Sequence, residues 1–325
     1  MSESSDWEIP PQAQPKPADW PFDLDRALSA VLGLRATVPA DAYTAGTLGT
    51  ERAGNGVLIR EDGVVLTIGY LITEADSVWL NTNDGRAVPG HVMAYDQETG
   101  FGLVQALARL KLPPLPLGRS ASAQPGDRVI VAGAGGRPHA LNARIAAKQE
   151  FAGYWEYLLD EAIFTVPAHP NWGGTAVIDG EGALIALGSL HLQQGGEGNE
   201  RDHLNMTVPI DLLPPILDDL LTLGRPNHPP RPWLGLYATE IDDKVVVAGL
   251  ASGAPARRAG LKTGDIVLAV AGEEIADLAS LYRKVWRRGA AGVEVPMVVF
   301  RGGRTLDLEV RSADRTQFLK SPSLH

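Results

Sequence analysis

Residues 47–210 hold a succession of short apolar runs that are separated by turn dipeptides. Examples are NGVLIREDGVVLTIGYL around Asp62-Gly63, SVWLNTNDGRAVPGHVMAYD, GDRVIVAGAGG, EAIFTVPAHP and TAVIDGEGALIALGSLHL. Strands of this length and spacing, joined by Asp-Gly, Gly-Asp and Gly-Gly turns, are typical of a β-barrel or a β-sandwich. The sequence therefore predicts a mainly β fold for this part of the chain.

Proline-rich stretches divide the chain into parts. RPNHPPRP has four prolines in eight residues and predicts a linker between two domains. The predicted parts are a Pro-rich N-terminal arm, a first domain, the linker, a second domain and a C-terminal tail, over residues 1–23, 24–224, 225–232, 233–313 and 314–325. A chain of 325 residues is long enough for a hydrophobic core in each domain.

Three stretches have apolar residues at helical spacing. In residues 23–36 these are Leu24, Leu28, Val31 and Leu32, which predicts a helix with Asp23 or Asp25 as its cap. A second helix is expected over 208–224, where Gly224 is the stop signal, and a third over 277–288, which ends at Gly289.

Aromatic residues in the arm need an apolar surface. Trp7, Trp20 and Phe22 are unusual for a free Pro-rich linker. Trp20 and Phe22 either fasten the arm to its own domain, the simpler interpretation, or dock on a neighbouring subunit.

Composition excludes several classes of function. A formal charge of -10 argues against a nucleic-acid or anionic-membrane surface, because phosphate contact needs a basic footprint. The chain has no cysteine, which excludes disulfides, thiolate catalysis and Cys-based metal sites.

The first 20 residues lack the pattern of a secretory signal, and no apolar run is long enough to cross a bilayer. If Met1 is the natural start, we expect a cytoplasmic protein.

The order of the motifs resembles the HtrA/Deg family. In the first domain the similar segments are GNGVLIREDGVVLTIGYLI, DGRAVPGHVMAYDQETGFGLVQAL, PLPLGRSASAQPGDRVIVAGAGG, NWGGTAVID and MTVPIDLLPPILDDLL. In the second they are RPWLGL, SGAPARRAGLKTGDIVLAVAGEEI and VVFRGG. The resemblance implies a trypsin-like double six-stranded β-barrel, followed by a PDZ domain of α+β type.

The same resemblance implies that the catalytic triad is missing. The His, Asp and Ser positions of the family fall on Tyr70, Gly100 and Trp172. Indole offers only a donor, phenol is a poor base at pH 7, and glycine has no side chain. The oxyanion hole of this fold uses the backbone N–H groups of the nucleophile and of the residue two before it. That residue is Pro170, which has no N–H.

A substitute catalyst is the alternative. His169, His191 and His203 lie near the expected pocket, and Asp96 and Glu98 lie near the lost Asp position. However, the seven histidines show no metal-ligand spacing, so we expect satisfied or solvent-facing histidines and no metal or cofactor. Ser120, Ser122 and Ser189 have no identifiable basic partner and lack the sequence context of a nucleophile turn.

Trp172 itself has two interpretations. It either plugs the former catalytic cleft, which is the favoured one, or lines that cleft together with Tyr70 as a binding surface for a peptide or aromatic ligand.

The peptide-binding residues expected of a PDZ domain, in contrast, are present in the sequence. The resemblance assigns the carboxylate-binding loop to Trp233, Leu234, Gly235 and Leu236, with Arg231 as a nearby charge. Such a loop offers backbone N–H groups to a peptide's C-terminal carboxylate, and the peptide adds as a strand beside the following strand. The opposite wall would be the helix over 277–288, where Leu281 and Val285 are the candidate contacts.

Two functions remain open from the sequence. The first is a catalytically inactive pseudoprotease that acts as a scaffold, adaptor or chaperone-like module by binding C-terminal or unfolded peptide segments. The second is an active serine endopeptidase or a hydrolase with an unrecognised catalyst. The family resemblance also implies a homo-oligomer, with a trimer built through the aromatic arm as the expected form.

Overall fold

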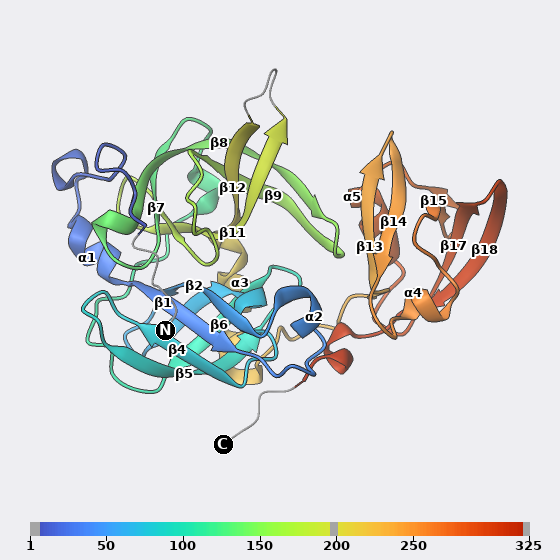
Figure 1. Cartoon of the computed structure of the whole chain (residues 1–325), viewed down its shortest axis with the longest axis horizontal. Helices are drawn as coiled ribbons and strands as arrows, with labels where there is room; N and C mark the ends of the chain where they lie inside the picture. Colours follow the sequence, from blue (N-terminus) through green and yellow to red (C-terminus); the bar gives the residue numbers. More distant parts are fainter. Residues whose placement is uncertain (1–6, 196–200, 321–325) are drawn as a thin grey trace. The chain divides into compact units, whose positions relative to one another are not determined.

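The computed structural model describes residues 7–195 and 201–320 (Figure 1). The chain divides into two compact units, and the mainly β fold that the sequence predicts is confirmed. The first unit contains residues up to 149 together with 161–227, and the second contains residues 150–160 and 228–320.

The first unit contains two closed six-stranded barrels, in the strand orders β1-β2-β3-β6-β5-β4 and β10-β11-β12-β9-β8-β7. The strands of the first barrel are β1 Val31–Thr37, β2 Glu51–Leu58, β3 Val64–Ile68, β4 Ser77–Asn81, β5 Ala87–Tyr95 and β6 Phe101–Ala106. Those of the second are β7 Arg128–Ala132, β8 Ala140–Gly153, β9 Tyr157–Val166, β10 Ala176–Ile178, β11 Leu184–Gly195 and β12 Arg201–Pro209. Closure pairs the strands around each barrel and leaves no free sheet edge.

The prediction of a helix over residues 23–36 is wrong for the second half of that range, which forms a strand. Asp23 caps a short helix, α1 (Leu24–Ser29), by accepting a hydrogen bond from the Arg26 backbone N–H. The chain then enters β1, which pairs with both β2 and β4. Barrel closure requires this strand, and its side chains are buried alternately with period two, which overrides a helical spacing of only four apolar residues.

The helix expected over 208–224 begins later than predicted. Residues up to Pro209 belong to β12, where Val208 pairs with Leu187 of β11. The helix α3 (Pro214–Leu223) follows, and Gly224 ends it in the left-handed conformation as expected. The remaining helical segments of this unit are η1 Pro17–Asp19, α2 Ala45–Leu48, η2 Gly69–Leu71, η3 Ser120–Ser122, η4 Arg137–His139 and η5 Ile210–Leu212.

The arm packs against its own unit. Trp20 is buried and lies under the guanidinium of Arg128, 5.0 Å from its ring centre. Phe22 lies where a side chain at Gly182 would have to be, and Trp7 meets the ring of His169 edge-on. The structure therefore shows the simpler of the two interpretations of these aromatic residues.

The second unit is built on the sheet β13-β14-β15-β17-β18, with the short β16 beside β15. Its strands are β13 Leu236–Ile241, β14 Lys244–Leu250, β15 Ile266–Val270, β16 Glu273–Glu274, β17 Glu294–Arg301 and β18 Arg304–Arg311. Its helices are α4 Pro255–Arg258, α5 Leu278–Trp286 and η6 Arg315–Phe318. Gly302 and Gly303 both have positive φ in the predicted hairpin turn between β17 and β18.

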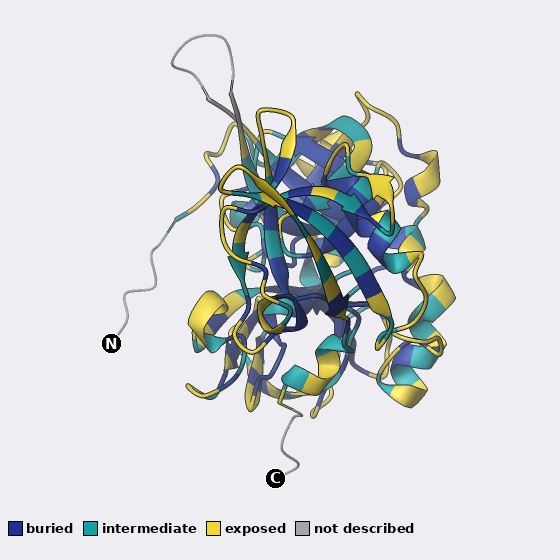
Figure 2. Ribbon diagram, turned by 90° about the vertical axis from the view of Figure 1, so that its right-hand side faces the viewer, coloured by how far each residue is buried: buried dark blue, intermediate teal, exposed yellow. Residues whose placement is uncertain are grey.

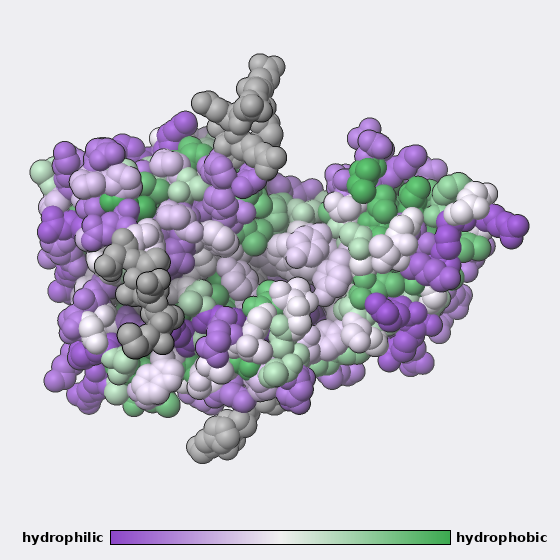
Figure 3. Space-filling view, in the orientation of Figure 1, coloured by the Kyte–Doolittle hydropathy of each residue, from purple (hydrophilic) through white to green (hydrophobic). Residues whose placement is uncertain are grey.

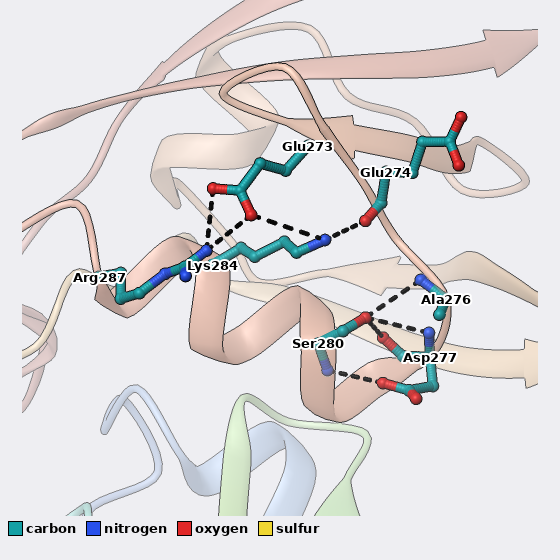
Figure 4. A network of polar contacts seen from close by, with 7 residues as sticks. All are labelled: Glu273, Glu274, Ala276, Asp277, Ser280, Lys284 and Arg287. Atoms are coloured by element: carbon teal, nitrogen blue, oxygen red, sulfur yellow. Dashed lines mark hydrogen bonds and ion pairs between the residues drawn. The ribbon is translucent and has the colours of Figure 1, made fainter.

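Helix α5 is held firmly at both ends (Figure 4). Asp277 and Ser280 form a reciprocal capping box at its N-terminus. Near its C-terminus, Arg287 and Lys284 reach the carboxylate of Glu273, at 2.8 and 4.0 Å. Its inward face adds Leu278, Leu281, Tyr282 and Val285 to the core of the unit.

Two domain boundaries differ from those expected. Residues 150–160, at the turn between β8 and β9, group with the second unit although the sequence places them in the domain 24–224. Part of the expected tail, η6, also belongs to that unit, where Phe318 packs on the ring of Trp233.

Buried residues follow the strands, and exposed ones gather at turns and outer helix faces (Figure 2). On the second unit, apolar surface is interrupted by hydrophilic residues (Figure 3). Among residues 7–195 and 201–320, no helix combines the length and the apolar character needed to span a membrane.

Candidate functional site

The turn that contains Trp172 is fixed by glycines. Gly174 has φ +75°, and a Cβ there would lie 2.0 Å from the carbonyl oxygen of Asn55. A Cβ at Gly188 would lie 2.3 Å from the carbonyl oxygen of Trp172. Gly174, the second glycine of the pair after Trp172, is therefore required by close backbone approach and by positive φ.

Asn55 of β2 fastens this turn to the first barrel. Its side-chain nitrogen donates to the carbonyls of Asn171 (3.1 Å) and Gly173 (3.0 Å), and its side-chain oxygen accepts from the N–H of Ala134 (2.9 Å). Asn55 is buried. The sequence interpretation missed this residue, because its role joins positions more than 100 residues apart and leaves no local motif.

Tyr70 and Trp172 meet between the two barrels. The Tyr70 hydroxyl donates to the carbonyl of Ser189 (2.8 Å). Burial raises the pKa of Tyr70 above its ordinary value, and the neighbouring Trp172 side chain acts in the opposite direction. The phenol therefore stays protonated and serves as a structural hydrogen-bond partner.

Gly100 lies next to the segment that contains Tyr70. Its carbonyl accepts from the N–H of Gly69 (2.7 Å), next to Tyr70. The neighbouring Asp96 is buried, and its carboxylate accepts from the N–H and hydroxyl of Thr99, at 2.9 and 2.6 Å. Asp96 therefore shapes the turn before β6. The structure thus places Gly100 next to the segment that contains Tyr70.

His169 is enclosed and fully engaged. It has no exposed surface, its Nε2 contacts the carbonyl of His139 (3.0 Å), and its Nδ1 accepts from the N–H of Asn171 (3.2 Å). Burial lowers the pKa of His169. These contacts fix a neutral tautomer with Nε2 as the donor, so His169 is the satisfied histidine that we expected from the sequence.

His191 and His203 stack in a row with Trp172. The rings of Trp172 and His191 lie 5.2 Å apart, and those of His191 and His203 lie 4.9 Å apart. The Nδ1 atom of His203 lies 3.1 Å from the Nε2 atom of His191. Burial, followed by the charge of His203, lowers the pKa of His191. Among the residues that the structure describes, no group of three or more His, Asp or Glu could hold a metal ion.

The three candidate serines are structural in their contacts. Ser120 accepts from the N–H of Asp211 (3.1 Å) and is buried, and the Ser122 hydroxyl donates to the Arg119 carbonyl (2.8 Å). Ser189 is buried in β11, where its carbonyl accepts from Tyr70.

The loop before β13 forms a carboxylate site. The backbone N–H groups of Leu234, Gly235 and Leu236 all point to the carboxylate of Glu156, at 3.0, 2.6 and 3.0 Å. Gly235 has φ +71°, which lets successive N–H groups face one anion. Sequence reasoning named these three residues but missed Glu156, which is 78 residues upstream of the first of them.

The other residues predicted to line the peptide groove lie in different surroundings. Leu281 and Val285 lie in one buried cluster with Leu234 and Leu236. Trp233 donates its N–H to Ala313 (3.0 Å), outside the donor set of the loop. The Arg231 guanidinium lies over the ring of Trp286, 4.5 Å from its centre.

Family models match both parts of the chain. Residues 54–187 match the trypsin-like peptidase domain, and residues 232–311 match the PDZ domain. The chain belongs to the HtrA/Deg-like family. The fold and the order of domains that the sequence predicted for an HtrA/Deg-like protein are thereby confirmed.

Similar HtrA/Deg proteins are distant in sequence. A probable periplasmic serine endoprotease DegP-like of Halomonas elongata is 26% identical over 275 residues, which cover 80% of this chain and 56% of that protein. The serine endoprotease DegS of Salmonella typhimurium is 24% identical, with 90% and 85% covered. The chain spans about half the length of the first curated relatives that it matches.

Solved structures of the family share the fold. The HtrA-type protease AlgW with tripeptide has a TM-score of 0.53 and 22% identity, and the match covers 93% of this chain and 99% of that one. The serine endoprotease from Yersinia pestis has a TM-score of 0.53 and 19% identity, with 90% and 98% covered.

Proposed function

We propose that this chain is a non-catalytic HtrA-like protein that binds C-terminal or unfolded peptide segments through its PDZ domain, as a scaffold, adaptor or chaperone-like module. The observation that carries the proposal is the convergence of the N–H groups of Leu234, Gly235 and Leu236 on one carboxylate. A loop that binds a side-chain carboxylate in this way has the geometry to bind a terminal one.

The contacts between the barrels support the absence of proteolysis. Tyr70, Gly100 and Trp172 supply neither a base, nor a carboxylate, nor a nucleophile, and the Tyr70 hydroxyl is hydrogen bonded to the Ser189 carbonyl. Pro170 removes one oxyanion donor, which alone costs about 10²–10³ in rate. Loss of an entire triad costs on the order of 10⁶. We infer that these losses leave no serine-protease chemistry.

Peptide binding also agrees with a relative. The AlgW structure contains a tripeptide, and we extend that class of ligand to this chain. An apolar C-terminus suits the groove, because Leu234, Leu236, Leu281 and Val285 form the apolar cluster next to the carboxylate loop.

Hydrolysis of fluorescein-labelled casein at high protein concentration tests the proposal, with and without peptides that carry free apolar C-termini. We expect no turnover above buffer under either condition. Turnover that survives repurification would establish the alternative, an active endopeptidase or hydrolase, and would make His169, Asp96 and Glu98 the first residues to mutate.

A cytoplasmic location and a homo-oligomeric, trimeric state are further parts of the proposal. The Halomonas relative is named periplasmic, so cell fractionation with an antibody against the native protein decides the first point. Sedimentation of the full chain decides the second.

A further inference from the structure

The PDZ groove already contains a segment of this chain. Residues 150–160, here called the hairpin segment, belong to the same compact unit as the PDZ sheet and helices. The segment contributes Glu156, which is 7% exposed and whose carboxylate accepts all three loop N–H groups. Convergence of successive backbone N–H groups on one carboxyl group is also how such a loop recognises a peptide's C-terminus.

Both walls of the groove hold the main chain of the segment. The N–H of Ala238, on the free edge of β13, donates to the carbonyl of Tyr154 (2.9 Å). From the opposite wall, the Tyr282 hydroxyl of α5 donates to the carbonyl of Gly153 (2.7 Å). A strand-edge bond next to a bound carboxylate is how a peptide ligand is recognised by strand addition.

An apolar side chain of the hairpin segment is buried in the hydrophobic core of the same unit. Leu158 is 8% exposed and belongs to the same buried cluster as Leu234, Leu236, Leu281 and Val285. Burial of a leucine side chain stabilises an arrangement by about 1.5–3 kcal/mol. An incoming apolar side chain would therefore compete with Leu158 for this cluster.

Two ion pairs to one arginine lie at the two ends of the hairpin segment. Arg283 of α5 pairs with Glu150 (2.5 Å) and also with Asp160. These groups are exposed, and surface pairs contribute little to stability. Their value here is positional, because one guanidinium holds both strands of the segment in register against α5.

The backbone at Glu156 is strained in support of this contact. Its φ is +60°, a left-handed conformation that costs a residue with a side chain roughly 1–2 kcal/mol. Such strain persists where the surrounding structure determines it, as at ligand clamps. A glycine would relieve the strain, but it could not supply the carboxylate.

We propose that the hairpin segment is an internal ligand of the PDZ domain, and that an external peptide binds only after it displaces Glu156 from the carboxylate loop. This inference rests on the proposed function, because it names what regulates the same groove. The apparent affinity for an external peptide is then reduced by the fraction of molecules in which the groove is open.

Hydrogen exchange of the full chain tests the internal ligand without any peptide. We expect the amides of Leu234, Gly235 and Leu236 to exchange at least about tenfold faster in Glu156→Ala than in the native protein, since the carboxylate that accepts their hydrogen bonds is lost. Glu294→Ala, which removes an exposed acid from β17, is the matched control and should exchange as the native protein does. Unchanged exchange in Glu156→Ala overturns the inference.

Peptide binding separates the inference from the proposed function. The probe is a fluorescein-labelled decapeptide with three apolar C-terminal residues and a free carboxylate, measured by anisotropy beside its C-terminally amidated form. We expect Glu156→Ala to bind the free acid about tenfold or more tightly than the native protein, and neither protein to bind the amide. Arg283→Ala, an exposed change that leaves the loop intact, should give a smaller gain.

Equal affinity of the native protein and Glu156→Ala for the free acid would overturn the internal ligand and leave the proposed function standing. A different outcome is that Glu156→Ala shows faster exchange of the amides at 234–236 and yet binds no peptide. That result would overturn the proposed function, and with it displacement by peptides, while the internal contact itself would stand.

Discussion

The Oε1 atom of Glu156 lies 2.6 Å from the backbone nitrogen of Gly235. That nitrogen belongs to the loop which, in a peptide-binding PDZ domain, would hold the terminal carboxylate of a ligand. A side chain of the same molecule therefore occupies the position of a ligand. Binding by this domain becomes a competition, and conditions that weaken the internal contact should strengthen external binding.

Peptide binding should strengthen as pH rises. Burial raises the pKa of Glu156 from 4.5 to about 7, although the N–H groups of Leu234, Leu236 and Gly235, and the charge of Arg315, act in the opposite direction. The docked segment therefore binds a proton that the released segment does not. Its stabilisation is complete below about pH 4.5 and is lost as pH rises through about 7.

Anisotropy titrations of the labelled free-acid peptide at pH 5.5 and 8.0 measure this effect. We expect affinity to rise by about tenfold or more over this range. Tyr282 also faces the groove, but burial raises its pKa, so it stays neutral throughout. Glu156→Ala should show the same affinity at both pH values, and a native protein without pH dependence would contradict the prediction.

Gly174→Ala should destabilise the first unit strongly. The new Cβ would lie 2.0 Å from the Asn55 carbonyl oxygen at a position with φ +75°, which we expect to cost more than about 2 kcal/mol. Gly180→Ala is the matched control, because its Cβ would meet nothing within 4 Å. Thermal melts by circular dichroism compare the two, and equal melting temperatures would show that the turn relaxes.

Trp172→Ala distinguishes the two interpretations of this indole. If Trp172 is a plug, loss of its contacts with Tyr70 and His191 should lower stability by about 2 kcal/mol. Trp79→Ala removes an indole that is 47% exposed and should cost clearly less. A melting temperature equal to that of the native protein would instead favour a binding surface.

Trp172→Ser should not create a protease. The new hydroxyl would face Tyr70, whose raised pKa keeps it from acting as a base near pH 7, and Pro170 still provides no oxyanion donor. We expect casein hydrolysis to stay at the buffer level. Activity within a factor of about 10³ of a working serine protease would contradict the pseudoprotease proposal.

Removal of residues 1–23 should lower stability whether or not the chain forms a trimer. Trp20 is buried against the first unit, and the N–H of Ile9 donates to the Pro138 carbonyl (2.8 Å). Sedimentation of the full chain and of a 24–325 truncation tests the trimer separately. A monomeric mass for both proteins would reject a trimer that depends on the arm.

Much of the fold could be predicted from the sequence because its signals are local. Turn dipeptides such as Asp62-Gly63 and the alternation of apolar residues act over a few positions, and the order of motifs indicated the two domains. The helix predicted over 23–36 failed because Val31 and Leu32 suit a helix and a strand equally, and only pairing with β2 and β4 decides between them.

The sequence by itself determined the residue types at the site: Trp172 next to Gly-Gly, Pro170 without an N–H, and a glycine in the loop before β13. Only the tertiary structure decided that Asn55 fastens the Trp172 turn, that His169 is enclosed, and that Glu156 fills the carboxylate loop. The physical reason is that a hydrogen bond between distant positions depends on where folding places two groups in space, whereas a turn or a missing donor is a property of the residues themselves.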